Sequence, residues 1–450
     1  MNIALIHFRV GETDGVSLEM DKWRRILEKM GHHTMYVAGS EGTSKATIIP
    51  ELFYRDEFDL MLNDECYIKL ENYDEKSLIK AVIDRSKVIE EQFVKIFKEN
   101  EIDLIVPNNL FCLGRSPHIG MALYNAIKRT NVKVVNHHHD FYWEREFFQN
   151  PTISFIEEIL EKYFPPVDFG DNMKHAVINK LAQVDIKARK GIEAKVIPNV
   201  FDFNAELWIK DEFNKDFKEK LGVTDNQILF LQATRVTNRK AIELAVDLIH
   251  ELNKEENKKM MIGKTLYNGK IFNKDTEYVL ALVGMHEGGD GYEEKLINHA
   301  KELNVNMIVN PDLVDHSRHI SENGDKIYSL WDAYVYCDMI TYPSIYEGWG
   351  NQFLEGLFAK KPQVVYEYTV FESDIKEKNF NIISLGNSYK ERENRLAYIS
   401  DEKIQEAAKE VRNYLCDKEK YYKSVEENFE IGKNNFSMES LEILLKDLFS

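Results

Sequence analysis

The sequence predicts an α/β protein of two domains, each built around a parallel sheet. Short apolar segments rich in Val, Ile and Leu alternate with longer segments in which apolar residues recur every three or four positions. This alternation is typical of the βα units that build parallel sheets. The 450 residues exceed the size of one ordinary core, and a hydrophobic content of 44% supplies enough apolar side chains for two cores.

The first half is expected to begin with a strand at residues 3–6, a turn from Gly11 to Gly15 and a helix that Gly31 ends. Between about Ser40 and Asp84 the pattern weakens, and an irregular or partly helical insertion is expected there. The other predicted elements are strands at 34–38, 102–106, 132–135, 176–178 and 194–197, and helices near 87–98, 119–128 and 180–188.

The domain boundary is predicted just after Pro198-Asn199-Val200-Phe201-Asp202, because the proline ends a strand and a charged stretch follows. We therefore expect an N-terminal domain of residues 1–202, a second domain of residues 203–430 and a terminal helix within residues 431–450. The elements predicted for the second half are strands at 228–232, 279–283, 307–309, 338–342 and 362–366, and helices at 241–252 and 327–334, with a helical tail from about 401. The apolar side chains of the helix at 327–334 are assigned to the core; they are Ile327, Leu330, Trp331 and Tyr334.

The most informative segment runs from Pro343 to Glu355 and joins a buried strand to an apolar helix through a glycine-containing turn. Free amides at the start of such a helix attract a phosphate or a polarised hydroxyl, and Gly348 and Gly350 let the backbone come close. Glu347 in the turn and Glu355 one turn into the helix can accept hydrogen bonds from sugar hydroxyls. The segment predicts a nucleotide-sugar site.

A second candidate segment is Arg235-Val236-Thr237-Asn238-Arg239-Lys240, between a predicted strand and a predicted helix. Arg235 offers a planar fork and Lys240 a point charge, so the two can flank a diphosphate. Arg239 could replace either of them. A solvated basic turn is the alternative.

The motif Pro-Ser-x-x-Glu-Gly-x-Gly, with seven residues between Glu347 and Glu355, resembles the paired-glutamate motif of retaining GT-B glycosyltransferases of family 4. The resemblance implies two Rossmann-like domains facing a central cleft, with a C-terminal helix crossing back to the first domain. It implies transfer of a hexosyl unit, with glucose or mannose favoured, from a nucleoside diphosphate sugar to a hydroxyl acceptor with retention. Arg235 and Lys240 would bind the leaving diphosphate, Glu347 the hexose and Glu355 the ribose.

The same resemblance implies further site residues. Gly350, Gly348 and Asn351 of the turn would bind the donor, and so would residues after two other strands, Met285 and Leu313.

The resemblance implies Gly15 in the first loop, near the transferred group and the acceptor, and His139 and Asp140 after a strand, facing the donor sugar, with His138 as the alternative to His139. Three successive histidines, 137–139, suggest a metal site, but neighbours on an extended chain point to opposite faces and cannot all bind one ion. No obligatory metal or cofactor is expected.

The formal charge of −18, from 58 basic and 76 acidic residues, argues against binding of nucleic acid or of an anionic membrane. Four scattered cysteines, the absence of a signal-like N-terminus and the absence of a long apolar run favour a cytoplasmic protein. The expected partners are a nucleotide-sugar donor and a small-molecule or glycan acceptor. The donor base, the hexose, the acceptor and the oligomeric state stay open.

Three alternatives remain on the same fold: a sugar phosphorylase, a nucleotide-sugar epimerase and a non-catalytic binding protein. The Pro198 turn lacks the glycine that family 4 enzymes often have there, which weakens the resemblance slightly.

Overall fold

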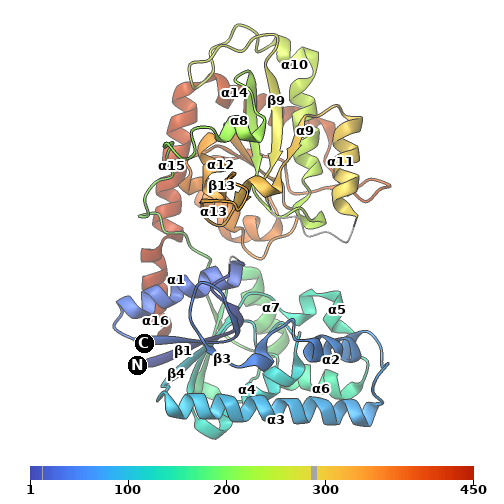
Figure 1. Ribbon diagram of the computed structural model, residues 1–450, viewed down its shortest axis with the longest axis vertical. Coiled ribbons are helices and arrows are strands. Elements are labelled where there is room, and N and C mark those ends of the chain that lie inside the picture. The colour runs from blue at the N-terminus through green and yellow to red at the C-terminus, as the bar shows by residue number, and fades with distance from the viewer. Residues whose placement is uncertain (13, 285–290, 450) are drawn as a thin grey trace. The chain divides into compact units, whose positions relative to one another are not determined.

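The computed structural model describes residues 1–12, 14–284 and 291–449 (Figure 1). The chain forms two compact units. The first unit contains residues 1–200 and the C-terminal residues from 438 onward, and the second contains residues 201–437. Each unit is an α/β layer structure around a parallel sheet, as the sequence predicts.

The first unit contains a parallel sheet of seven strands in the order β3-β2-β1-β4-β5-β6-β7. The strands are β1 (Asn2–Val10), β2 (His33–Glu41), β3 (Thr47–Ile48), β4 (Leu104–Pro107), β5 (Lys133–His138), β6 (Met173–Val177) and β7 (Ala194–Val196). The chain order reverses between β1 and β4, and in open parallel sheets ligands bind at the carboxyl ends of the strands beside such a reversal.

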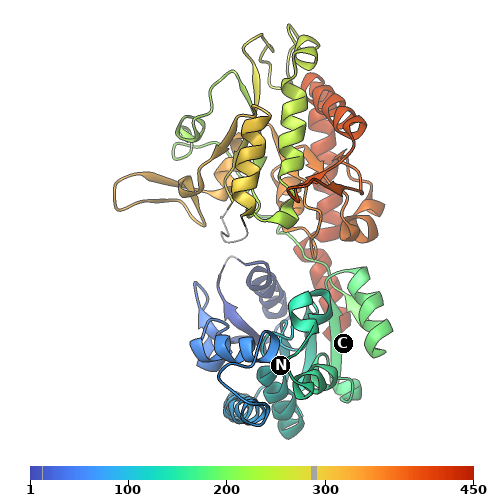
Figure 2. The ribbon, with the colours of Figure 1, turned by 90° about the vertical axis from the view of Figure 1, so that its right-hand side faces the viewer.

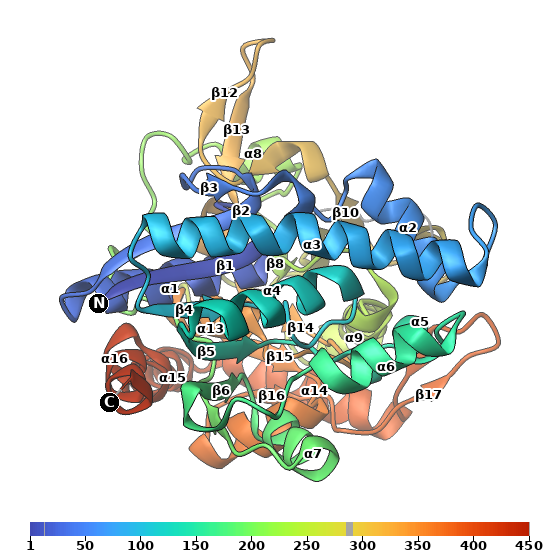
Figure 3. The same cartoon turned by 90° about the horizontal axis from the view of Figure 1, so that it is seen from below.

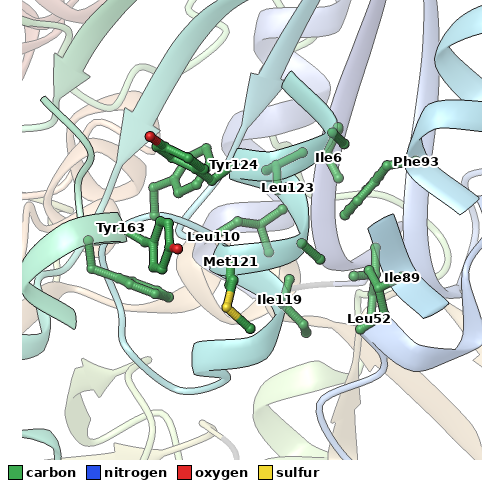
Figure 4. Close-up of a cluster of buried hydrophobic side chains, with 14 of the residues drawn as sticks. Ile6, Leu52, Ile89, Phe93, Leu110, Ile119, Met121, Leu123, Tyr124 and Tyr163 are labelled. Atoms are coloured by element: carbon green, nitrogen blue, oxygen red, sulfur yellow. The ribbon is translucent and has the colours of Figure 1, made fainter. Parts of the chain in front are cut away.

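Helices cover both faces of this sheet. They are α1 (Gly15–Lys29), α2 (Glu57–Tyr67), α3 (Glu75–Glu99), α4 (Pro117–Thr130), α5 (Glu146–Gln149), α6 (Ser154–Tyr163), α7 (Lys180–Lys190) and α16 (Met438–Phe449). Alternate residues of β1 serve the two faces: Ile6 packs with α3 and α4, whereas Leu5 packs with α1 and α16. Figure 4 shows Ile6, Ile89, Phe93 and Leu123 in the first of these layers, and Figure 3 shows α3 running beside α4. The C-terminal helix α16 thus belongs to the first unit.

The second unit contains a parallel sheet of six strands in the order β10-β9-β8-β14-β15-β16. The strands are β8 (Gln227–Gln232), β9 (Glu277–Leu282), β10 (Met307–Val309), β14 (Met339–Tyr342), β15 (Gln363–Val365) and β16 (Ile383–Ser384). The helices are α8 (Phe217–Leu221), α9 (Glu243–Asn253), α10 (Glu255–Lys259), α11 (Tyr292–Glu302), α12 (Leu330–Tyr336), α13 (Asn351–Phe358), α14 (Asp401–Cys416) and α15 (Lys418–Phe436).

Smaller strands complete the second unit. A three-stranded group has the order β11-β13-β12, and β17 pairs with β18. Their bounds are β11 (Val314–Asp315), β12 (His319–Ile320), β13 (Lys326–Ser329), β17 (Lys390–Glu391) and β18 (Ala397–Tyr398). Strands β12 and β13 project from the body of this unit (Figure 2).

Two sequence expectations are wrong. The helix predicted for residues 327–334 begins only at Leu330, because Ile327 lies in β13 and Ser329 forms a capping box with Asp332. The helix expected near residues 87–98 begins already at Glu75, where Asp74 caps its N-terminus, whereas the expectation of a partly helical segment at residues 40–84 is confirmed by α2 and the first turns of α3.

Candidate active site

Two loops of the second unit begin at the same edge of its sheet. Strands β8 and β14 are parallel neighbours, so the loops that follow them leave from their carboxyl ends side by side. The loop after β8 carries Arg235, Arg239 and Lys240, and the loop after β14 is the turn of residues 343–350. The amide of Ile345 donates a hydrogen bond to the carbonyl of Arg239 at 3.0 Å, which joins the two loops.

The centre of this site is a buried ion-pair cluster. The ammonium group of Lys240 donates to Glu347 Oε1, and Arg239 Nη1 donates to Glu347 Oε2 at 2.8 Å. Only 7% of Lys240 and 8% of Glu347 are exposed. The structure therefore places Lys240, predicted to bind the diphosphate, in contact with Glu347, predicted to bind the hexose. It also shows Arg239 as a second direct partner of the Glu347 carboxylate.

The charges of the cluster perturb one another. Burial is the largest influence on Lys240 and lowers the pKa of its ammonium group, against the opposing attraction of Glu347. Burial alone would raise the pKa of Glu347, but the charges of Lys240 and Arg239 outweigh it and hold that pKa below its ordinary value. Glu347 is therefore a stable carboxylate whose charge depends on its two cationic partners.

Gly350 is required by the packing of the turn. It has a φ of +130°, and a Cβ placed there would lie 2.2 Å from the hydroxyl oxygen of Tyr368 and 2.9 Å from that of Tyr342. The Tyr368 hydroxyl donates to the carbonyl of Trp349 at 2.5 Å. The buried side chains of Tyr342 and Tyr368 thus pack against the turn just before α13 begins at Asn351.

Glu355 lies on α13 and is held by a neighbouring helix. The hydroxyl of Tyr334, from α12, donates to Glu355 Oε2 at 2.6 Å. Tyr334 is fully buried, and burial followed by the charge of Glu355 raises the pKa of its phenol. The phenol therefore stays a donor, which orients the carboxylate predicted to bind a ribose.

The other predicted donor residues follow the adjacent strands of the same sheet. Leu313 ends the 3₁₀ helix Pro311–Leu313, which comes directly after β10. Met285 lies outside the described residues. Gly284, just before it, approaches the loop of Arg235 closely: a Cβ on Gly284 would lie 1.8 Å from the carbonyl oxygen of Thr234.

Among the buried polar atoms of these loops without a hydrogen-bond partner in the described part of the chain are Thr237 Oγ1 and Trp349 Nε1. Thr237 lies between Arg235 and Lys240, and Trp349 lies between the two glycines of the turn. Buried polar groups are rarely left unpaired, so these two atoms are suited to a polar ligand.

In the first unit a polar cluster lies at the carboxyl ends of β1, β4 and β5. The side-chain oxygen of Asn108 accepts hydrogen bonds from His137 Nδ1 at 3.1 Å and from His139 Nε2 at 3.2 Å. The backbone carbonyl of Asn108 accepts one from His7 Nδ1 at 2.9 Å. His138 points the other way and lies 3.0 Å from His175, nitrogen to nitrogen. The alternation expected along this strand is confirmed.

Burial controls the protonation of these histidines. It lowers the pKa of His7 to about 4 and that of His139 to about 4, although the nearby carboxylates Asp14 and Asp140 oppose the shift. Both rings are neutral at pH 7. Because His139 Nε2 carries the hydrogen donated to Asn108, its Nδ1 is left as a hydrogen-bond acceptor.

Gly15 and Asp140 occupy different positions around this cluster. Gly15 is the first residue of α1 and is exposed, and the side chain of Asp14 before it accepts from the amides of Val16 and Ser17 at 3.1 and 3.2 Å. Asp140 forms an ion pair with Arg145 at 3.2 Å. The roles predicted for Gly15, Asp140 and His139 stay predictions.

Sequence reasoning missed His7 and the adjacent pair Asn108 and Asn109. Asn109 has a φ of 59°, and its side-chain oxygen accepts from the amide of His139 at 2.8 Å. The available signal was two asparagines directly after a buried strand, a position at which side chains reach the ligand edge of a parallel sheet.

Within residues 1–12, 14–284 and 291–449, no three His, Cys, Asp or Glu side chains are grouped so that they could hold a metal ion. No helix of the described part of the chain is both long enough and apolar enough to cross a bilayer.

Two units of this kind, each an α/β layer structure around a parallel sheet, have the architecture of GT-B glycosyltransferases. The fold is shared with a solved glycosyltransferase from Rickettsia africae, with a TM-score of 0.62, 16% identity and coverage of 100% of this chain and 97% of that one. At this identity the likeness concerns the fold alone.

The chain belongs to the mannosylglucosylglycerate synthase family. It is 42% identical over 438 residues to the mannosylglucosylglycerate synthase of Petrotoga mobilis, covering 97% of this chain and 99% of the relative. It is 38% identical over 448 residues to that of Thermotoga maritima, covering 99% of each. No protein-family model matches the sequence. Membership supports hexosyl transfer in carbohydrate biosynthesis.

Proposed function

We propose that this chain is a retaining glycosyltransferase of family 4 that transfers a mannosyl unit from a nucleoside diphosphate mannose to a hydroxyl of glucosylglycerate. The names of its two relatives describe a product with mannosyl, glucosyl and glycerate parts. The observation that carries the proposal is the cluster of Arg239, Lys240 and Glu347, held between the loops after β8 and β14. It combines the two functions that such a transfer needs, a cationic site for a leaving diphosphate and a carboxylate for sugar hydroxyls.

The cluster supports a defined exchange of partners. A bound diphosphate brings a new anion to Arg235, Arg239 and Lys240, and it competes with Glu347 for the ammonium group of Lys240. One oxygen of Glu347 is then released to accept a hydrogen bond from a hexose hydroxyl. When the sugar–phosphate bond breaks, the cations stabilise the negative charge of the leaving group, and loss of one such donor costs about 3 kcal/mol of barrier.

The remaining groups position the substrates. Glu355, oriented by Tyr334, binds the ribose hydroxyls, and neutral His139 orients the transferred sugar through its free Nδ1. The departing phosphate takes the acceptor proton on the same face of the sugar, which retains the anomeric configuration. The mechanism needs no metal ion, so EDTA should leave turnover unchanged. A cytoplasmic location is part of the same proposal.

The first experiment is a thermal-shift screen with ADP, GDP and UDP and their mannose and glucose derivatives, since binding to the folded state raises the unfolding temperature. The donor that binds is then incubated with glucosylglycerate, and NMR determines the configuration of the new anomeric centre. Absence of transfer from every donor would refute the proposed activity, and an inverted centre would refute retention.

The same reaction mixtures test the alternatives. Sugar 1-phosphate formed from inorganic phosphate would favour a phosphorylase. A donor recovered with one inverted hydroxyl would favour an epimerase, and binding without any turnover would favour a non-catalytic protein.

A further inference from the structure

Three arginines of the first unit surround one tyrosine ring. The guanidinium carbons of Arg9, Arg55 and Arg115 lie 4.8, 5.2 and 5.2 Å from the ring centroid of Tyr54. Arg9 Nη1 also donates to the Tyr54 hydroxyl at 2.6 Å, and Arg115 Nη2 donates to the Tyr54 carbonyl at 3.0 Å. A ring has two faces, so at least two of the three cations share a face. We call these four residues the arginine cage.

The cage lies at the ligand edge of the first sheet. Arg9 is near the carboxyl end of β1, and Arg115 is in the loop between the adjacent strand β4 and α4. Tyr54 and Arg55 follow the 3₁₀ helix Pro50–Leu52, which comes directly after β3. The cage is continuous with the histidine cluster through Asp14, which pairs with Arg9 at 3.2 Å and acts electrostatically on His7 and His139.

Positive charge in the cage is only partly neutralised. Arg9 forms ion pairs with Glu12 at 2.8 Å and with Asp14. In the described part of the chain, neither Arg55 nor Arg115 has a carboxylate in ion-pair contact. Such a gathering of cations is unusual in a protein with a formal charge of −18, where acidic partners are abundant.

The surroundings of Arg115 disfavour the charged form of its guanidinium group. It is half-buried, and burial is the first cause that lowers the pKa of its guanidinium. Tyr54 and, more weakly, the carboxylate of Asp64 oppose this effect, whereas Arg55 and Arg9 add to it by repulsion. An anion bound between the guanidinium groups would remove the repulsion and satisfy their remaining N–H donors.

We infer that the arginine cage binds the carboxylate of the acceptor's glycerate group. The inference rests on the proposed function, which supplies an acceptor with one carboxylate. Arg55 and Arg115 form the binding fork, Arg9 is held in place by its acidic partners, and Tyr54 fixes the three side chains. The carboxylate fixes the acceptor on the first unit while its sugar extends toward the histidine cluster.

The test compares two acceptors that differ in one group, glucosylglycerate and glucosylglycerol, in which CH₂OH replaces the carboxylate. Arg55→Gln and Arg115→Gln should each raise KM for glucosylglycerate about ten- to a hundred-fold with little change in kcat, because a charge-assisted interaction made in the ground state is lost. Neither variant should change the rate with glucosylglycerol by more than about two-fold.

Arg24→Gln is the matched control. Arg24 also lies 5.2 Å from a tyrosine centroid, that of Tyr36, but it pairs with Glu28 on α1, away from the cage. Arg55 is exposed, so its variant should fold even if Arg115→Gln does not.

Each outcome decides the inference. Equal losses with both acceptors, or an unchanged KM, would overturn it. Tighter, cage-dependent binding of a phosphorylated glucosylglycerate would assign the cage to a phosphate instead and overturn the carboxylate assignment. If the wild type transfers no sugar, the proposed function fails; calorimetric binding of glucosylglycerate that is lost in Arg55→Gln would then still support the cage, and no binding would overturn it.

Discussion

Replacing Lys240 with methionine tests the centre of the site most directly. Methionine keeps an unbranched apolar side chain, one atom shorter than that of lysine, but lacks the charge that neutralises Glu347. Since both residues are more than nine-tenths buried, the carboxylate remains in the interior with Arg239 as its cationic partner, and 45% of the Arg239 side chain is exposed. A half-exposed cation neutralises a buried charge poorly.

The size of the effect follows from this geometry. Removing one partner of a buried ion pair lowers the free energy of unfolding by about 3–5 kcal/mol. Because Arg239 still contacts the carboxylate, we expect a loss at the lower end, about 3 kcal/mol. For a unit of this size each 1 kcal/mol shifts the unfolding temperature by about 2–4 °C, so the second unit should melt about 6–12 °C lower. The matched double variant Lys240→Met with Glu347→Gln leaves no unpaired charge and should lose less than half as much.

The pH dependence of stability is a second, independent test of the ion pair between Lys240 and Glu347. In the wild type the pKa of Glu347 is lowered by folding, so its stabilising contribution is present above the unfolded pKa and is lost as pH falls through the folded pKa. Without Lys240 the burial effect dominates and raises that pKa. A raised pKa reverses the sign: stability is then lost as pH rises. The deficit of Lys240→Met should therefore be larger at pH 7.5 than at pH 5.

Differential scanning fluorimetry of the full chain at both pH values measures the deficit, and steady-state kinetics should show kcat reduced by about a hundred-fold. The two units can melt separately, so the transition of the second unit is the one to follow. An unfolding temperature within 2 °C of the wild type, or an equal deficit at the two pH values, would refute the buried-pair reasoning. Full turnover would remove Lys240 from the diphosphate site.

Three further predictions concern the other groups. Glu355→Gln should weaken nucleoside diphosphate binding about ten-fold by calorimetry, because a charged acceptor of ribose hydroxyls is lost; unchanged affinity would contradict the assignment. Gly350→Ala should cost about 3 kcal/mol or more in urea unfolding, because its φ is +130° and its Cβ would meet the Tyr368 hydroxyl. Adding Tyr368→Phe should recover part of that loss, and a fully stable Gly350→Ala would reject the packing argument. Since burial lowers the pKa of His7 and His139 to about 4, the unfolded chain binds more protons below pH 6.5, and the first unit should lose stability as pH falls from 6.5 to 4. His7→Asn should flatten that profile, and a wild-type unfolding temperature independent of pH in this range would refute it.

Local sequence signals were sufficient to predict an element where its turn residues and its apolar periodicity agree. The strand ending at Tyr342, the glycine-containing turn and the apolar face of α13 were all predicted, because each depends on residues within a few positions of one another. Periodicity failed at Ile327, where a strand runs into a capped helix and the apolar spacing continues through the junction. Helix α3 begins twelve residues earlier than expected: the cap formed by Asp74 with Ser77 marks its start, and Leu78 and Val82 already belong to its buried face.

In the candidate site, too, short motifs identified single residues but not the contacts between residues far apart along the chain. Glu347 and Lys240 were identified as separate groups by their motifs, but their contact spans 107 positions and depends on the pairing of β8 with β14. Arg239 was ranked below its neighbours because sequence alone does not say which side chain of a basic turn faces a carboxylate. Asn108 had no motif and became visible only where three strands end together.

The sequence by itself determined the βα alternation, the strand–turn–helix of the paired glutamates and the kind of chemistry that those residues favour, because these depend on short-range spacing. Tertiary structure alone decided which charges meet. The burial of Glu347 between two cations, and the convergence of Arg9, Arg55 and Arg115 on Tyr54, arise from strand order, which brings together residues that are far apart along the chain.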